Sequence, residues 1–271
     1  MGMIDKDIAM VSGPPKDINN LQKIATIIGL AGLLILVLAA FNVNFPNKGI
    51  WLFISLTSIA AGIILFSKGA YGSKQEGIKN DGVFFKGISS RGFMGWIAGI
   101  AMTGFYVVLY FYAELLGLNP DGENTGVIAL FDPLSRTLSG NPASQWFVYG
   151  TLYTVAIIAF GIKFMWKYRH NKYERLRTFS IMFFQTGFAF IIPELMARLN
   201  TDSFKLPYYD LKNIWPLNYY NFEQYRVDDM ISSGSIGVGL LIFGVVSILV
   251  VTPIMTYKYG KRWYCSWVCG C

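Results

Sequence analysis

Charged residues are scarce in this chain of 271 residues, where Asp, Glu, Lys and Arg together make up 14%. Soluble domains carry about a quarter charged residues, so the deficit argues against an ordinary soluble fold. Hydrophobic residues reach 54%, and the mean hydropathy is +0.43. The composition therefore predicts a chain that lies mostly in a lipid bilayer. The net charge of +7 comes from short loops between apolar runs, which favours a topology signal over nucleic-acid binding.

Histidine occurs once, as His170, in a basic loop between Lys167 and Lys172, where it is expected to be solvated. One histidine cannot supply two axial ligands, so the chain holds no haem b of its own and the cytochrome b class is excluded. The sequence also lacks a nucleophile–base pair, a phosphate-binding loop and a zinc-hydrolase motif. No catalytic residue is assigned for these reasons.

Six apolar runs of roughly 18–22 residues are present, the length that crosses about 30 Å of hydrocarbon as helix. Runs of this length predict helices rather than barrel strands. The fold class is therefore an all-α polytopic membrane bundle of six transmembrane helices. The polar start, residues 1–20, has no apolar core and is not a cleavable signal peptide, so the first run is expected to stay as an anchor. The six runs are Ile24–Val43, Ile50–Ser67, Phe93–Tyr112, Trp146–Met165, Thr178–Ala197 and Gly234–Met255.

The Lys and Arg residues set the orientation, because cytoplasmic loops carry the larger share of them. Alternating the six spans puts 17 of the 23 basic residues on one side, together with both ends of the chain. Both termini are therefore predicted to be cytoplasmic. The chain divides into a polar cytoplasmic N-terminus (1–23), a membrane domain (24–257) and a cytoplasmic cysteine segment (258–271).

Cysteine is absent before position 265, and all three cysteines fall in the last seven residues: Cys265, Cys269 and Cys271. Clustered thiols on a reducing face are more often metal ligands or redox groups than disulfides. Soft thiolates select iron–sulfur clusters, zinc or cuprous copper. The basic residues of 258–262 are expected to favour the thiolate form and to offset part of a cluster's negative charge.

The spacing C-x3-C-x-C differs from the ferredoxin run C-x2-C-x2-C-x3-C, and a 4Fe–4S cluster normally takes four cysteines. A fourth ligand would come from a partner chain, from a water or side-chain oxygen, or from sequence beyond Cys271. A cysteine run that stops on a cysteine is expected to be the start of a longer iron–sulfur region. The alternative is that these are juxtamembrane thiols that bind nothing or carry an acyl chain.

The stretch Tyr259-Gly-Lys-Arg-Trp-Tyr-Cys265-Ser-Trp-Val-Cys269 resembles the R-x-W-C-G-W-x-C-P segment of the membrane polyferredoxins. That family includes quinol-dehydrogenase subunits of periplasmic nitrate reduction, a membrane electron donor of nitrous oxide reductase and an assembly factor of copper-containing oxidases. Its members place several helices before a cytoplasmic cysteine segment that leads into a ferredoxin-like domain. Here Gly270 stands where the family has proline, and Cys271 is an additional cysteine.

The resemblance implies that Cys265 and Cys269 are ligands of an iron–sulfur cluster, of the 4Fe–4S type, with Cys271 as a third metal ligand. It implies an electron-transfer protein of the bacterial inner membrane, acting as a carrier subunit of an oxidoreduction. Electrons would pass between membrane quinol, or an outer redox partner, and a cytoplasmic carrier in a larger membrane complex.

Glu194 is the second candidate, with Gln185 in the same fifth span. Ionisable groups inside a membrane are functional candidates by default. The functional interpretation is a proton acceptor at an outer-side quinol site, with Pro193 opening the helix beside it. The alternative is an interfacial carboxylate that pairs with Arg198, one turn away.

Two other function classes stay open. A transporter or channel would show polar groups near mid-membrane and broken helices in related positions; Gln185 is the best mid-span polar group, and no paired interruption is found. A structural or assembly subunit would have cysteines that are incidental or bind zinc.

Two local predictions concern packing and capping. Small residues at Gly95-xxx-Gly99 and Ser235-xxx-Gly239 are expected to permit close helix contacts. Asp132, which precedes Pro133, is expected to cap the start of an outer helix.

Overall fold

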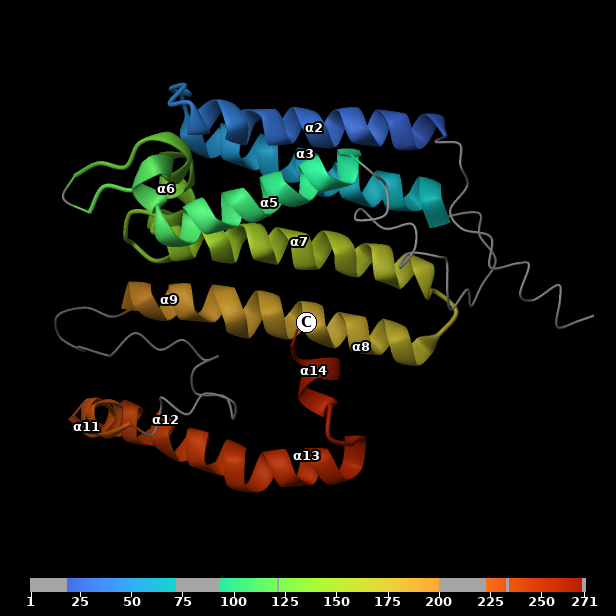
Figure 1. Cartoon of the computed structure of the whole chain (residues 1–271). Helices are drawn as coiled ribbons and strands as arrows, with labels where there is room; N and C mark the ends of the chain where they lie inside the picture. The colour runs from blue at the N-terminus through green and yellow to red at the C-terminus, as the bar shows by residue number, and fades with distance from the viewer. Residues whose placement is uncertain (1–18, 72–92, 121, 200–222, 233, 270–271) are drawn as a thin grey trace, which may run out of the picture.

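The computed structural model describes residues 19–71, 93–120, 122–199, 223–232 and 234–269, and these residues form helices without any strand. The long helices lie side by side in a row (Figure 1). Short 3-10 or π segments, labelled η, interrupt or extend them. The elements are α2 (Asn20–Ala40), α3 (Lys48–Tyr71), α5 (Phe93–Phe111), η2 (Ala113–Leu116), α6 (Gly126–Leu138), α7 (Gln145–Lys167), α8 (Lys172–Phe183), η3 (Phe184–Ile191), α9 (Ile192–Leu199), α11 (Gln224–Ser232), α12 (Ser235–Val246), η5 (Ser247–Val251), α13 (Thr252–Tyr259) and α14 (Trp263–Trp267).

Five of these helices are long and apolar enough to cross a membrane, which suggests a multi-pass membrane protein. The all-α prediction is confirmed in this sense. Two of the five are continuous through π segments, since α8, η3 and α9 form one helix and α12, η5 and α13 form another. The five stretches are Asn20–Ala40, Lys48–Ala70, Gln145–Lys167, Lys172–Arg198 and Gly237–Tyr259.

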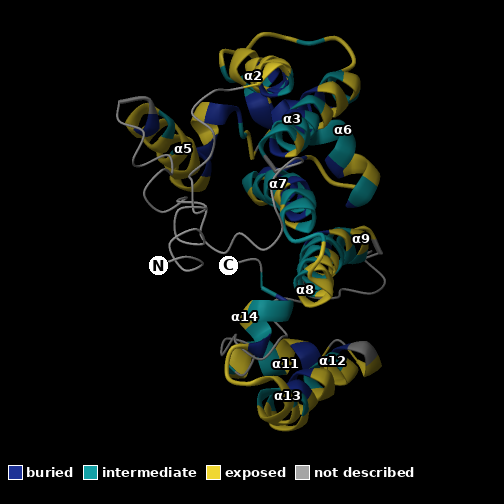
Figure 2. Ribbon diagram, turned by 90° about the vertical axis from the view of Figure 1, so that its right-hand side faces the viewer, coloured by how far each residue is buried: buried dark blue, intermediate teal, exposed yellow. Residues whose placement is uncertain are grey.

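The third expected span corresponds to α5, whose apolar part, Gly95–Phe111, is shorter than the other five. Most of its described side chains are exposed, including Trp96 and Met102. It contacts α7 through rings near its end, where Tyr110 packs edge-on against Trp146 with centroids 4.7 Å apart. Figure 2 shows α5 standing apart from the row of long helices.

Helices α2 and α3 form a closely packed antiparallel pair. A capping box begins α2: the Asn19 side chain accepts from the Gln22 amide, and the Gln22 side chain accepts from the Asn19 amide. Midway along the pair, the buried Ser55 hydroxyl donates to the Gly32 carbonyl over 2.8 Å. Small residues allow this approach, because a Cβ added to Gly32 would lie 2.6 Å from the Ser55 carbonyl oxygen.

The small-residue prediction was wrong at Gly99 and at Gly239. A Cβ added to Gly99 or to Gly239 would meet no described atom within 4 Å. No described residue therefore approaches either helix closely at these two glycines. Close contacts occur at Gly32 and Gly62, between the first two long helices, and at Gly150 and Gly161 of α7.

Several of the best-buried side chains belong to α6, which lies beside the ends of α2, α3 and α7 (Figure 1). Ile128 and Phe131 are fully buried there against residues of α3 and α7. The prediction that Asp132 caps a helix start was wrong, since α6 begins at Gly126 and Asp132 lies inside it. Its carboxylate instead accepts from the Asn124 side chain and from the Ala143 amide, both over 2.8 Å.

The last helices form a second group beside the α8–α9 helix. Met230 of α11 is buried against Met196 of α9 and against Leu240 and Leu241 of α12. Large apolar residues are exposed along the long helices, and Figure 2 colours the exposed residues of the ribbon yellow. Such faces suit a lipid surrounding rather than water.

Each of the two π segments ends two residues before a proline: η3 ends at Ile191 ahead of Pro193, and η5 ends at Val251 ahead of Pro253. Proline lacks an amide hydrogen, and its ring clashes with the carbonyl four residues earlier. A π turn widens the helix and removes that clash. The two helices are therefore interrupted in the same way, a pairing that the sequence analysis did not find.

Candidate functional site

The cysteine segment begins where Gly260 ends α13 and turns the chain back. Gly260 has φ +88°, in the left-handed region that glycine adopts at little cost. Its amide donates to the Thr256 carbonyl over 2.9 Å, and its carbonyl accepts from the Trp263 amide over 3.1 Å. The turn places α14 between α13 and the α8–α9 helix (Figure 1). The segment therefore packs against the helices instead of continuing the axis of α13.

Two tryptophans fix α14 on its two sides. Trp263 is 4% exposed and donates its ring N–H to the Thr256 hydroxyl over 3.2 Å. The Trp267 ring packs edge-on against Tyr173 of α8, with centroids 5.5 Å apart, and lies 6.0 Å from the ring of Tyr259. These rings attach the segment to both α13 and α8.

The C-terminal end of α14 is held by side chains of the neighbouring helix. The Ser180 hydroxyl donates to the Trp267 carbonyl over 2.7 Å, and the Gln185 side-chain amide donates to the Val268 carbonyl, also over 2.7 Å. The last carbonyls of a helix have no partner within it. Ser180 and Gln185 therefore satisfy two backbone acceptors that would otherwise lie unpaired among apolar residues.

Both described cysteines lie on this segment as thiols outside any disulfide. Cys265 is in α14 and exposed, whereas Cys269 follows α14 by two residues and is half-buried. The Cys269 amide donates to the Tyr264 carbonyl over 2.9 Å, a bond that closes the C-terminal end of α14. Cys271 lies outside the described residues. Lys261 and Arg262 are exposed next to α14, as the sequence analysis expects for a basic flank.

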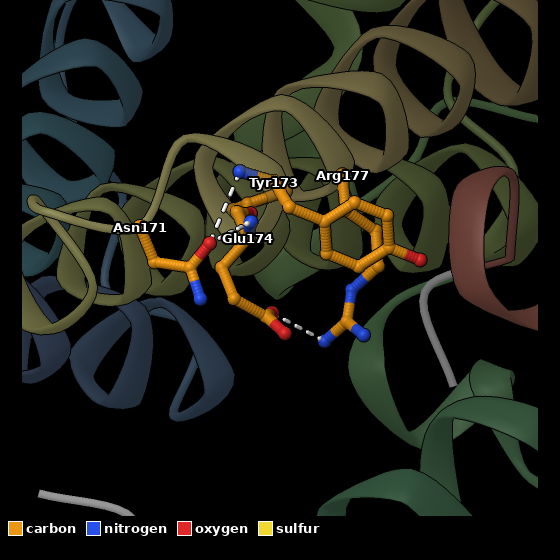
Figure 3. A network of polar contacts seen from close by, with 5 residues as sticks. Asn171, Tyr173, Glu174 and Arg177 are labelled. Atoms are coloured by element: carbon orange, nitrogen blue, oxygen red, sulfur yellow. Dashed lines mark hydrogen bonds and ion pairs between the residues drawn. The ribbon is translucent and has the colours of Figure 1, made fainter. Parts of the chain in front are cut away.

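The first turn of α8 is organised so that Tyr173 meets Trp267. Asn171 caps the helix by accepting from the amides of Tyr173 and Glu174 over 3.1 and 3.3 Å. Glu174 and Arg177 form an ion pair over 2.8 Å on the same turn. Figure 3 shows this capping network, with the Tyr173 ring projecting from it.

A cavity of about 190 Å³ lies beneath α14. Phe184 of η3 and Val251 of η5 line it from opposite helices. The other lining residues are Ser180, Met255, Tyr259, Trp263, Trp267 and Val268. The lining is mainly apolar because these side chains are mainly hydrocarbon. A larger hollow of about 450 Å³, between the α2–α3 connection and the start of α6, shares no lining residue with this cavity.

The structure separates the two residues that were grouped as a quinol or proton site. Gln185 bonds to the cysteine segment, whereas half-buried Glu194 lies nine residues further along, in the first turn of α9. Arg198 donates to the Thr137 carbonyl at the end of α6. The pairing of Glu194 with Arg198 stays a prediction, as does a quinol site at Glu194.

Ser180 was missed by the sequence analysis, although it acts together with Gln185. The two residues are five positions apart, a spacing that does not place them on one face of a regular helix. Gln185 was noticed only as a polar group near mid-membrane. The prolines were the available signal for the π segments, because each marks a place where a regular helix clashes with itself.

Two buried hydroxyls between α7 and η3 also escaped the sequence analysis. Thr154 and Thr186 have no hydrogen-bond partner for their hydroxyl oxygens among the described residues. The helices run antiparallel there, with the rings of Phe147 and Phe190 5.5 Å apart.

Compared with models of protein families, with curated proteins and with solved structures, the sequence gives no match.

Proposed function

We propose that this chain is a membrane electron-transfer protein whose cysteine segment carries an iron–sulfur site. The observation that carries the proposal is the gathering of all three cysteines within seven residues, on a segment that packs back against α8 through Trp267 and Val268. A chance distribution over the chain would not concentrate the thiols in this way. The resemblance of the same residues to the membrane polyferredoxin segment supports the proposal.

The donor chemistry fits such a group in part. Cys265 and Cys269 offer soft thiolate ligands four residues apart, next to two exposed cations. Among the described residues, no group of three or more metal-binding side chains is present. Cys271 is the third ligand in this proposal, and the fourth comes from a partner chain or from residues beyond it. When bound, the cluster supplies one-electron transfer, while the chain supplies its position and its surroundings.

The topology proposed for this function has six spans, with α5 as the third, and both termini in the cytoplasm of a bacterial cell. The five longer apolar helices and the distribution of Lys and Arg support it. In this arrangement the cysteine segment turns back into the bundle from the cytoplasmic side. Glu194 then lies toward the outer side, where it would accept a proton from quinol.

The test is anaerobic purification of the full-length protein, followed by measurement of iron, acid-labile sulfide and visible absorption. We expect iron and sulfide in the parent protein, and loss of both in the Cys265→Ser and Cys269→Ser variants with unchanged membrane insertion. Ser266→Ala, between the two cysteines, is the matched control and should retain iron. An iron-free, colourless parent protein would contradict the proposal, and zinc in its place would indicate an assembly subunit.

A transporter is the second candidate, because the two helices that line the small cavity are both interrupted before a proline. Paired interruptions of this kind mark binding sites in transporter folds. Proteoliposomes loaded with a pH-sensitive dye would report proton flux driven by an imposed gradient. Flux above that of empty liposomes would favour this candidate, particularly in a protein that contains no iron.

A further inference from the structure

We infer that Ser180 and Gln185 are positioning residues for the cysteine segment: together they hold its backbone and thereby fix where the Cys269 thiol lies. Its consequence for an iron–sulfur cluster rests on the proposed function, whereas the hydrogen bonds themselves are formed without a bound cluster. Two side chains of one helix, α8 with its continuation η3, hold two successive carbonyls of another segment. The second of these carbonyls belongs to Val268, the residue directly before Cys269.

The depth of these contacts makes the bonds important. Gln185 lies at the centre of the apolar stretch Lys172–Arg198, about 20 Å along the helix from either end at 1.5 Å per residue. The side chains of Gln185 and Ser180 contact the end of α14 inside the apolar part of the helix, away from both of its ends. Water does not reach backbone groups at such depth in lipid, so each carbonyl needs a protein donor. The alternative for the segment is to leave α8 altogether.

The packing beneath α14 is incomplete, so the two hydrogen bonds contribute more to holding α14 against the α8–α9 helix than they would in a filled core. The cavity of about 190 Å³ lies directly beneath the segment, and Ser180, Val268 and Trp267 are among its lining residues. Contacts across a void contribute no dispersion energy. Hydrogen bonds and the rings around Trp267 therefore hold the end of α14 to α8.

The consequence concerns the environment of the thiols. Cys265 is exposed and Cys269 is half-buried, although both belong to one short segment. The hydrogen bond between Gln185 and Val268 keeps the Cys269 thiol partly shielded from solvent, while the Cys265 thiol stays exposed. In an iron–sulfur site this asymmetry would give one ligand a drier surrounding than the other, and solvent exposure is one of the determinants of cluster potential.

The experiment measures alkylation of Cys269 in detergent-solubilised protein from which iron has been removed, with N-ethylmaleimide as the probe. Cys265 and Cys271 are replaced by serine so that a single thiol reports. Gln185→Met keeps the approximate length of the side chain but removes the amide donor, and Ser180→Ala removes the hydroxyl donor. We expect the alkylation rate to rise about fivefold for each lost hydrogen bond, since one such bond contributes on the order of a factor of five to a local equilibrium.

Two further variants distinguish positioning from a general loss of structure. Ser180→Thr retains a hydroxyl and should keep the parent rate. Thr178→Val on the same helix removes a hydroxyl that donates to the Glu174 carbonyl over 2.8 Å, away from α14, and should also leave the rate unchanged. If Gln185→Met and Ser180→Ala alkylate at the parent rate, or if Thr178→Val accelerates equally, the positioning role is overturned.

A second measurement uses the iron-loaded protein with all three cysteines. The reduction potential of the cluster in Gln185→Met should differ from that of the parent, while the potential in Thr178→Val should not. If the parent protein contains no iron, the proposed function is wrong. The alkylation rates still decide whether Ser180 and Gln185 position the cysteine segment. Iron binding together with unchanged alkylation defeats only the role of these two residues.

Discussion

Gly62 of α3 lies directly against the backbone of Gly29 in α2. A Cβ atom added to Gly62 would come within 2.7 Å of the Gly29 Cα and 2.9 Å of the Ala25 carbonyl oxygen. The reverse is not true, because a Cβ added to Gly29 would find its nearest neighbour at 3.7 Å, an ordinary contact distance. Gly29 therefore has room for a side-chain methyl group and Gly62 does not, although both lie in the same contact between α2 and α3.

Gly62→Ala should destabilise the protein by about 1–3 kcal/mol, because its methyl group meets backbone that cannot move aside. Gly29→Ala should be neutral or slightly stabilising, since alanine favours helix by up to about 1 kcal/mol over glycine. Thermal unfolding in detergent, followed by circular dichroism, compares the two. Gly104→Ala on α5, where a Cβ meets nothing within 4 Å, is a further control, and equal losses in all three variants would contradict the close contact.

Thr154→Val should stabilise the protein by about 1 kcal/mol, because it removes a buried hydroxyl that has no partner among the described residues. Thr151→Val is the matched change one turn earlier on α7, where the hydroxyl donates to the Phe147 carbonyl over 2.9 Å. It should destabilise by about 1 kcal/mol. Melting temperatures that shift in the same direction for both variants would show that the two hydroxyls do not differ in this way.

Asp132→Ala should destabilise the α6 region by about 2–3 kcal/mol, since it leaves the Ala143 backbone amide and one N–H of the buried Asn124 side chain without an acceptor. Asp132→Asn keeps one oxygen in place and should cost less. Proteolysis of the 139–143 connection, measured by mass spectrometry, reports local opening. The interpretation fails if Asp132→Asn is cleaved as fast as Asp132→Ala.

The proposed topology predicts that the two ends of α7 face opposite compartments. With the native cysteines replaced by serine, Asn141→Cys should react with a membrane-impermeant maleimide added outside spheroplasts, because the outer side carries few basic residues. His170→Cys, whose native side chain is exposed beside Arg169, should react only after the membrane is opened. Reaction of both from one side would rule out α7 as a span.

Apolar length allowed the sequence to predict where the long helices lie to within a few residues, since hydrocarbon thickness sets helix length. It did not predict which glycines meet, because Gly29 and Gly62 become neighbours only after two helices pair in one register. Gln185 stood out as a polar group, but Ser180 did not, and their joint contact with α14 depends on the turn at Gly260. Such contacts come from tertiary packing, which helix periodicity does not encode.

The wide turns of η3 determine where the α8–α9 helix can tolerate the loss of a residue. A regular α-helix that loses one residue rotates everything beyond the deletion by about 100°, which would turn Glu194 to another face. A π turn holds one residue more than an α turn, so one residue removed within Phe184–Ile191 would tighten that turn and leave the faces on either side aligned. Length polymorphism in this helix should therefore be confined to η3, with Ser180 before it and Glu194 after it keeping their directions.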